Sequence, residues 1–139
     1  MVTVNGAEAV ARWSIGGAFL ERLASRQFEQ LGETLDESVR FRALLPPGPM
    51  EWHGAEAVVD TFRSWFGDAE DFEVVDAAVG GVGPRIHLSW RVRVRPAPFG
   101  IGAGWHLIEQ QAYADAVDAI EVLDLVCSGF NAEPSPAAG

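Results

Sequence analysis

Apolar residues recur at helical spacing in the first quarter of the chain. Over Ala7–Leu35 they return every three or four positions, which predicts an amphipathic helical stretch. The pair Gly16–Gly17 interrupts this stretch, so we expect either a kink or two separate helices. Gly32 is a candidate helix end, and a short turn over Leu35–Ser38 is expected after it.

The next segment contains a short strand and a second helix. Residues Val39–Leu45 alternate between apolar and polar, as expected for a strand with one buried face. The run Pro46–Pro49 combines prolines with a glycine, which predicts the end of that strand. In the helix expected over Ala55–Phe66, apolar side chains fall on one face.

After the second helix the hydrophobic period becomes that of strands. Residues Arg85–Arg95 alternate strictly, with apolar residues at even positions and polar residues at odd positions. Further strands are predicted over Phe72–Val79, Trp105–Tyr113 and Ile120–Ser128. The segment Pro96–Gly104 is rich in proline and glycine, and it forms either a disordered hairpin tip or a lid. Helices followed by an antiparallel meander predict the α+β class.

Length and composition agree with one globular domain. The chain has 139 residues, enough to bury about two thirds of its unfolded surface in a single core. Hydrophobic residues make up 48% and charged residues 22%, which excludes a disordered chain. We expect one domain over residues 1–131 and a flexible tail over residues 132–139, where small residues and proline dominate.

The charge balance excludes two classes of partner. The formal net charge is −10, and all ten basic residues are arginine. So acidic a chain is a poor partner for nucleic acid or an anionic membrane, because both interactions need basic patches. No apolar run approaches the roughly 20 residues of a membrane helix, and the first residues do not resemble a signal peptide, so a cytoplasmic location is expected.

Metal and disulfide chemistry have little support in the sequence. Cys127 is the only cysteine, so no internal disulfide can form. His53, His87 and His106 are the only histidines, and their spacing to acidic residues matches no metal-binding motif. We therefore expect neither a metal nor a cofactor.

The order of elements resembles the SnoaL-like branch of the nuclear transport factor 2-like superfamily. The resemblance covers nearly the whole chain and is carried by the first long helix, by WHGAEAVVDTFRSWF (Trp52–Phe66) and by LIEQQAYADAVDAIEVLDLVCSGF (Leu107–Phe130). It implies a curved antiparallel sheet wrapped on N-terminal helices to form a cone with an apolar pocket. The family includes ketosteroid isomerases, scytalone dehydratase, limonene epoxide hydrolases, polyketide cyclases and binding modules, so the fold alone does not fix the function.

Within such a cone, strand parity decides which side chains line the pocket. On the strand Trp105–Tyr113 we expect odd positions to face inward, which places Glu109 in mid-strand inside the pocket. Burial raises the pKa of a carboxyl group, so Glu109 is the candidate catalytic acid or base. The expected ligand-binding residues are mostly apolar, with a few that can hydrogen-bond: Trp90, Trp105, Gln111, Tyr113, Leu123, Leu125, Cys127, Phe62 and Phe19. The same parity places His87 and His106 on the outer face of the sheet.

Other catalytic residues of the resembled family are missing from the matching positions. Ketosteroid isomerases have a tyrosine, and an aspartate that acts as the catalytic base, where this chain has Phe19 and Ala43. Limonene epoxide hydrolases use an arginine and two aspartates where it has Leu107, Glu109 and Leu125. Neither of these two reactions is therefore expected.

Two kinds of function remain open on the sequence. One is a cofactor-independent enzyme, such as an isomerase, dehydratase or cyclase, that acts on an apolar or polycyclic substrate with Glu109 as acid or base. The alternative is a non-catalytic module that binds a small apolar ligand, or that fills the cone with its own side chains and forms dimers. The inward carboxylate favours the enzyme, and the missing family residues favour the module.

The outer sheet face is a candidate protein interface. The polar positions of Arg85–Arg95 form a basic stripe there: His87, Ser89, Arg91, Arg93 and Arg95. Neighbouring strands are expected to add Gln110, Asp124 and Ser128 to the same face, with the apolar Ile108, Val122 and Val126 between them. Such a mixed face suits a two-fold interface, and homodimers through this face are common in the resembled family. An ordinary solvated face is the other interpretation.

Overall fold

The computed structural model describes residues 2–132, with side chains from Arg12 onward. Helices and strands follow one another in this order: α1 (Val2–Ala24), α2 (Phe28–Gly32), β1 (Leu35–Leu45), β2 (Gly48–His53), α3 (Ala55–Phe66), β3 (Asp71–Val82), β4 (Arg85–Arg95), β5 (His106–Ala116) and β6 (Ile120–Ala132). The tail expected over residues 132–139 lies outside the described residues except for Ala132, which ends β6.

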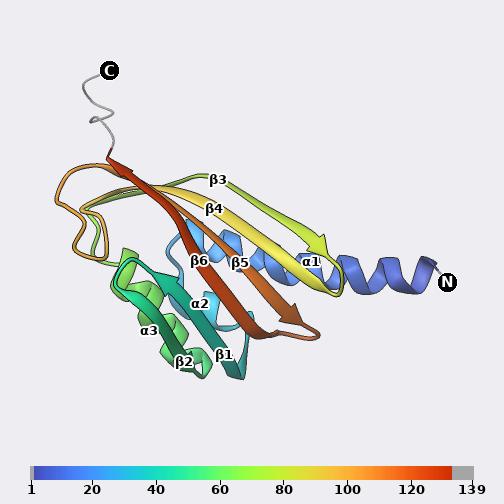
Figure 1. Ribbon diagram of the computed structural model, residues 1–139. Helices are drawn as coiled ribbons and strands as arrows, with labels where there is room; N and C mark the ends of the chain where they lie inside the picture. Colours follow the sequence, from blue (N-terminus) through green and yellow to red (C-terminus); the bar gives the residue numbers. More distant parts are fainter. Residues whose placement is uncertain (1, 133–139) are drawn as a thin grey trace.

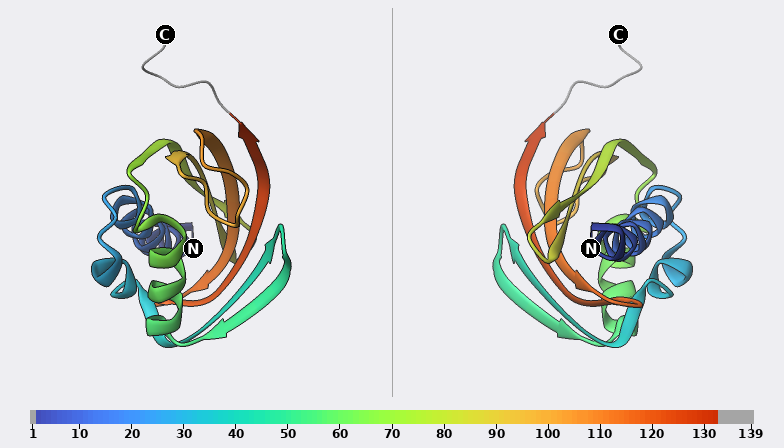
Figure 2. Two further views of the ribbon diagram at one scale, coloured as in Figure 1. Left: turned by 90° about the vertical axis from the view of Figure 1, so that its left-hand side faces the viewer. Right: turned by 90° about the vertical axis from the view of Figure 1, so that its right-hand side faces the viewer.

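The strands form one sheet that curves around the helices. Its order is β2-β1-β6-β5-β4-β3, and all neighbours are antiparallel except β1 and β6, which run parallel. The helices occupy the concave side of the sheet (Figure 1; Figure 2). The predicted α+β cone is confirmed.

Strict alternation on β4 produces the central wall of this cone. Its even positions, Ile86 to Val94, are fully buried against the helices, while the odd positions are only partly covered. A strand that buries one face must place its apolar residues at every second position, as this sequence does. The face predicted for β4 is therefore confirmed.

Aromatic rings from helices and strands meet at the centre of the cone. Phe62 of α3 contacts Phe19 of α1 and Phe41 of β1, with ring centroids 5.7 and 5.6 Å apart. Trp90 of β4 lies 6.0 Å from Phe19 and donates its indole N–H to Gln110 Oε1 at 2.7 Å. All five side chains are at most 1% exposed. The helices and the sheet are thus joined by one ring cluster that contains a satisfied polar pair.

The N-terminal helices divide at a different place from the one predicted. Helix α1 continues through Gly16–Gly17, and the break falls after Ala24, where Arg26 adopts a positive φ of 54°. The guanidinium of Arg26 donates to the carbonyl oxygens of Phe66 and Ala69 at 3.1 and 2.9 Å. The corner between α1 and α2 is therefore held by the end of α3, a long-range contact that local spacing does not reveal.

Strands β1 and β2 also differ from the prediction. β1 begins at Leu35, where a turn over Leu35–Ser38 was expected, and its pairing with β6 is irregular between Leu35 and Arg40. The prolines of Pro46–Pro49 form only a tight turn, and the chain returns as β2 with Leu44 opposite Pro49. β2 lies at the sheet edge, where a proline costs no ladder hydrogen bond.

The face assigned to β5 is wrong. Its even positions are buried, including Ile108, Gln110 and Ala112, and its odd positions face outward. Cross-strand partners share a face, and Gln110 pairs with the inward Trp90 while Glu109 pairs with the outward Arg91. The hydrophobic pattern of β5 predicted the wrong face because polar residues occupy two inward positions of this strand. Its first residue is also His106, so Trp105 precedes the strand.

Gly16 and Gly17 provide a matched test of the packing of α1 on the sheet. A Cβ atom on Gly16 would lie 2.8 Å from Leu88 Cδ2, whereas one on Gly17 would meet no atom within 4 Å. We expect Gly16→Leu to lower the free energy of unfolding by about 1–3 kcal/mol through overpacking. Gly17→Leu should raise it by up to about 1 kcal/mol, because leucine favours a helix more than glycine does. Urea unfolding followed by circular dichroism measures both, and equal losses would contradict the close approach.

Gln110 and Gln111 provide a second matched pair. Gln110→Leu removes the acceptor of the buried Trp90 indole N–H, which should cost about 1–3 kcal/mol of unfolding free energy. Gln111→Leu removes only a bond to His87 on the outer face, so its cost should stay near 0.5 kcal/mol or less, about that of a surface change. Chemical unfolding measures the unfolding free energy of both variants. A larger loss of unfolding free energy for Gln111→Leu than for Gln110→Leu would refute the inward placement of Gln110.

Candidate functional site

The structure brings six of the predicted pocket residues together inside the cone. Phe19, Phe62, Trp90, Leu123 and Leu125 are buried there, and Cys127 packs against this core while partly exposed. All six belong to, or pack against, one hydrophobic cluster that includes Phe41, and the ring of Phe62 contacts those of Phe19 and Phe41. The same residues that were expected to wall a pocket therefore form the packed centre of the domain.

The four remaining candidates lie outside that centre. Glu109, Gln111 and Tyr113 point to the outer face of the sheet because they occupy odd positions of β5. Trp105 lies in the preceding loop, with the guanidinium of Arg95 5.4 Å from its ring centroid. Glu109 therefore lies on the opposite side of the sheet from the apolar interior in which it was expected.

Two ionisable side chains, His106 and Cys127, face inward from the described strands β1 and β4–β6, and neither is a carboxylate. His106 was expected on the outer face but is 8% exposed, and its Nδ1 lies 3.0 Å from the carbonyl oxygen of Gly104. Burial raises the pKa of the Cys127 thiol, although Gln110 Nε2 donates to its Sγ at 3.6 Å. A thiol with a raised pKa stays protonated near neutral pH and is a poor nucleophile.

Aromatic side chains also cover the end of the cone next to the loop between β4 and β5. The ring of Phe99, in that loop, lies 5.4 Å from the ring of Trp65 on α3. Trp65 in turn contacts Trp52 of β2 at 6.3 Å. Phe99 and Ile101 pack against the core, so this loop closes over the interior.

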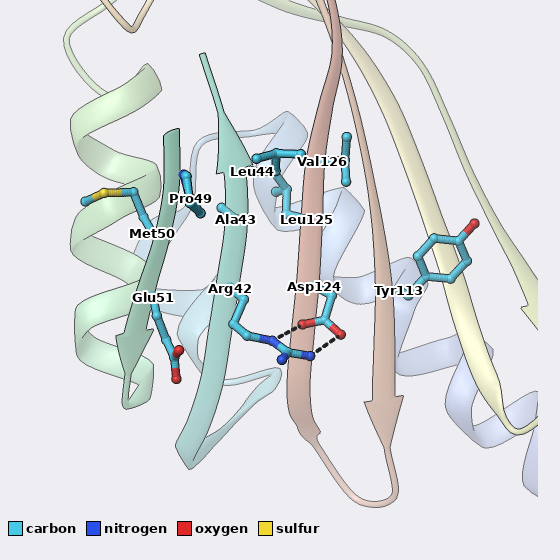
Figure 3. Close-up of a pocket in the computed structure, with 10 residues that line it drawn as sticks. All are labelled: Arg42, Ala43, Leu44, Pro49, Met50, Glu51, Tyr113, Asp124, Leu125 and Val126. Atoms are coloured by element: carbon cyan, nitrogen blue, oxygen red, sulfur yellow. Dashed lines mark hydrogen bonds and ion pairs between the residues drawn. The ribbon is translucent and has the colours of Figure 1, made fainter. Parts of the chain in front are cut away.

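The outer face carries an apolar hollow of about 500 Å³ across β2, β1, β6 and β5 (Figure 3). Leu44 and Val126 stand on its apolar side and are 54% and 40% exposed. Its complete lining is Arg42, Ala43, Leu44, Pro49, Met50, Glu51, Tyr113, Asp124, Leu125 and Val126. Of these residues, only Asp124 and Val126 were expected on the outer face, because β2 and the pairing of β1 with β6 were not anticipated.

Asp124 fixes the charged side of this hollow. It accepts hydrogen bonds from Arg42 Nε at 2.7 Å and from Arg85 at 3.0 Å, and Arg85 also binds Asp115. The hydrogen bond from Arg42, helped by Arg85 and opposed by partial burial, holds the pKa of Asp124 below its ordinary value. Asp124 is therefore charged at neutral pH, and both arginines are held close to the sheet.

A second, polar hollow of about 280 Å³ lies further along the same face. Asp76, Ser89, Trp90, Arg91, Glu109, Gln110, Gln111 and Ser128 line it. Ser128 lies at the irregularity between β5 and β6, and its hydroxyl donates to the carbonyl oxygen of Glu109 at 3.3 Å. The irregularity thus adds the hydroxyl of Ser128 to the hollow that Glu109 also lines.

The predicted basic stripe is neutralised within the chain. Arg91 binds Asp76, Arg93 binds Glu73, and Arg95 binds Glu70 and Asp71. These acids lie on β3 or just before it, directly across from the arginines. The acidic residues of DFEVVD were the signal available in the sequence. Paired in this way, the stripe offers no open cationic surface to phosphate groups.

The described residues add two further observations. Among residues 2–132, no group of three or more His, Cys, Asp or Glu side chains is arranged to hold a metal ion. No helix in that range is long and apolar enough to cross a membrane.

Comparison with known proteins shows which family has this architecture. A protein proposed to be a ketosteroid isomerase from Kribbella flavida is similar, with 17% identity, 93% of this chain and 85% of that chain covered, and a TM-score of 0.66. A proposed polyketide cyclase from Xanthomonas campestris pv. campestris shares 16% identity over 86% and 91% of the two chains, with a TM-score of 0.68. An LEH-like epoxide hydrolase from M. tuberculosis shares 14% identity over 87% of this chain and 85% of that chain, with a TM-score of 0.64.

At these identities the structural likeness concerns the fold alone, and no curated protein sequence matches the chain. The sequence profile of the SnoaL-like domain, however, matches residues 16–110, which is most of the described chain. The protein therefore belongs to the SnoaL-like domain family, and it has that family's six-stranded cone.

Proposed function

We propose that this protein is a non-catalytic SnoaL-like module that forms homodimers through the outer face of its sheet. The observation that carries the proposal is the contrast between the two sheet faces. Phe19, Phe41, Phe62 and Trp90 fill the centre of the cone, whereas the apolar hollow of about 500 Å³ is open on the outside. A surface of exposed apolar residues rimmed by charges is typical of a protein interface.

The interior gives little support to an enzyme of the kind known in similar proteins. Proton transfer needs an acid or base within hydrogen-bond reach of the substrate. Phe19 and Ala43, at positions where ketosteroid isomerases carry such groups, are buried and have no exchangeable proton. Glu109 lies behind the sheet from this space.

The outer face has the composition of a two-fold interface. Leu44 and Val126 expose apolar surface side by side on β1 and β6, and Tyr113 is exposed on β5 opposite Asp124. Arg42, Asp124 and Arg85 form a fixed charged network next to them. A network already satisfied within one copy can approach another copy without leaving an unpaired charge. The apolar surface supplies the gain on association.

Val126→Asp tests the interface directly. The change places an extra carboxylate in the apolar hollow, where a second copy would desolvate it, so the dissociation constant should rise by roughly a hundredfold. Sedimentation velocity over a concentration series measures the dimer of both forms, with circular dichroism to confirm folding.

Val117→Asp is the matched control, because Val117 is 66% exposed in the turn between β5 and β6, away from the hollow. It should leave the dissociation constant unchanged. A wild-type chain that stays monomeric at every concentration, or equal effects of the two substitutions, would contradict the proposed dimer.

A ligand screen tests the filled cone separately. Steroids, terpenoid epoxides and aromatic polyketides should leave the melting temperature unchanged, because the ring cluster occupies the space that they would need. A ligand at a hundred times its dissociation constant would stabilise the fold by about 2.7 kcal/mol, which a thermal-shift assay detects. A reproducible stabilisation by any of these compounds would argue for a ligand-binding cone.

A further inference from the structure

One arginine on the outer face of the sheet forms no ion pair with a carboxylate of the described chain. Five arginines of this face each bind a carboxylate of the same chain: Arg42, Arg85, Arg91, Arg93 and Arg95. Arg40 is the exception among the described residues of this face. It projects outward from β1, is exposed, and has no carboxylate within ion-pair distance in the described chain.

A carboxylate of the same face, on β5, also lacks a partner at ion-pair distance in the described part of the chain. Glu109 forms no ion pair within the described residues. Its neighbour across the strands, Arg91, is bound to Asp76 through two nitrogens, and the hydrogen bond to Asp76, with a smaller contribution from the charge of Glu109, raises the pKa of Arg91. Glu109 lines the polar hollow together with Ser89, Gln111 and Ser128. A carboxylate flanked by hydroxyl and amide oxygens suits a guanidinium, which donates several hydrogen bonds at once.

The strand register relates these two residues to the apolar hollow. Arg40 lies beside Val122 of β6, and Glu109 lies beside Gly129 of β6 from the opposite side. Because β6 separates β1 from β5, the midpoint between Arg40 and Glu109 falls on β6 between Asp124 and Val126. Both of these residues line the apolar hollow.

We propose that the two-fold axis of the dimer crosses β6 between Asp124 and Val126, and that Arg40 of each copy binds Glu109 of the other. This inference rests on the proposed dimer and adds its axis and its register. In a two-fold interface each contact occurs twice. An axis that lies in the interface, perpendicular to the line from Arg40 to Glu109 and above its midpoint, therefore brings Arg40 of each copy opposite Glu109 of the other. The same axis brings the two apolar hollows face to face.

Charge reversal tests this pairing. Arg40→Glu alone sets two carboxylates against each other, and Glu109→Arg alone sets two arginines against each other. Each single variant should raise the dissociation constant about tenfold or more at low salt, because like charges at an interface repel. An equimolar mixture of the two variants should instead form heterodimers with wild-type affinity, since both contacts then join opposite charges. Native mass spectrometry distinguishes the heterodimer from both homodimers.

Arg22→Glu and Glu56→Arg on the helices are the matched controls, because these residues lie away from the outer sheet face. They should leave the dissociation constant unchanged and should not favour heterodimers when mixed. A wild-type dimer that the reversals at Arg40 and Glu109 do not weaken would overturn the pairing but leave the dimer intact. A monomeric wild type would overturn the proposed function itself, so the two failures are distinguishable.

Discussion

The contact between Trp90 and the phenylalanines of the helices is the interaction on which the other features of the domain depend. It joins α1, α3, β1 and β4 in one ring cluster, and the Trp90 indole fixes the inward direction of Gln110 on β5. Once Gln110 points inward, Glu109 and Gln111 must point outward, because neighbouring residues of a strand alternate. The packing of the core thereby determines which charged groups reach the outer face.

The fold was predictable where one strand face is purely apolar. On β4 every inward residue is apolar and every outward residue is polar, so the local pattern and the tertiary structure agree. On β5 the inward set includes His106, Gln110 and small alanines, while Leu107 and Tyr113 face outward. Local hydrophobicity therefore favoured the odd positions of β5 as the inward ones. Only the register of β5 with β4 shows that the even positions face inward. The candidate site failed for the same reason, since the assignment of Glu109 to the pocket depended on that parity.

The two faces of the sheet differ in what they leave available to another molecule. The concave face is covered by buried rings that belong to the same chain, and their packing stabilises the domain. On the convex face, most charges are already bound in pairs, so their side chains have lost much of their freedom before any partner arrives. In the proposed dimer, this preorganisation would lower the side-chain entropy that association costs.

The parallel pairing of β1 with β6 has a consequence for the time course of folding. β1 and β2 are attached to the remaining sheet only through β6, and the bonded residues Arg42 and Asp124 are 82 residues apart. At about 5–20 residues per second, a ribosome needs roughly 4–16 s to synthesise the intervening chain. During that interval one edge of β1 is unpaired and open to aggregation. The last strand to be synthesised therefore closes the sheet.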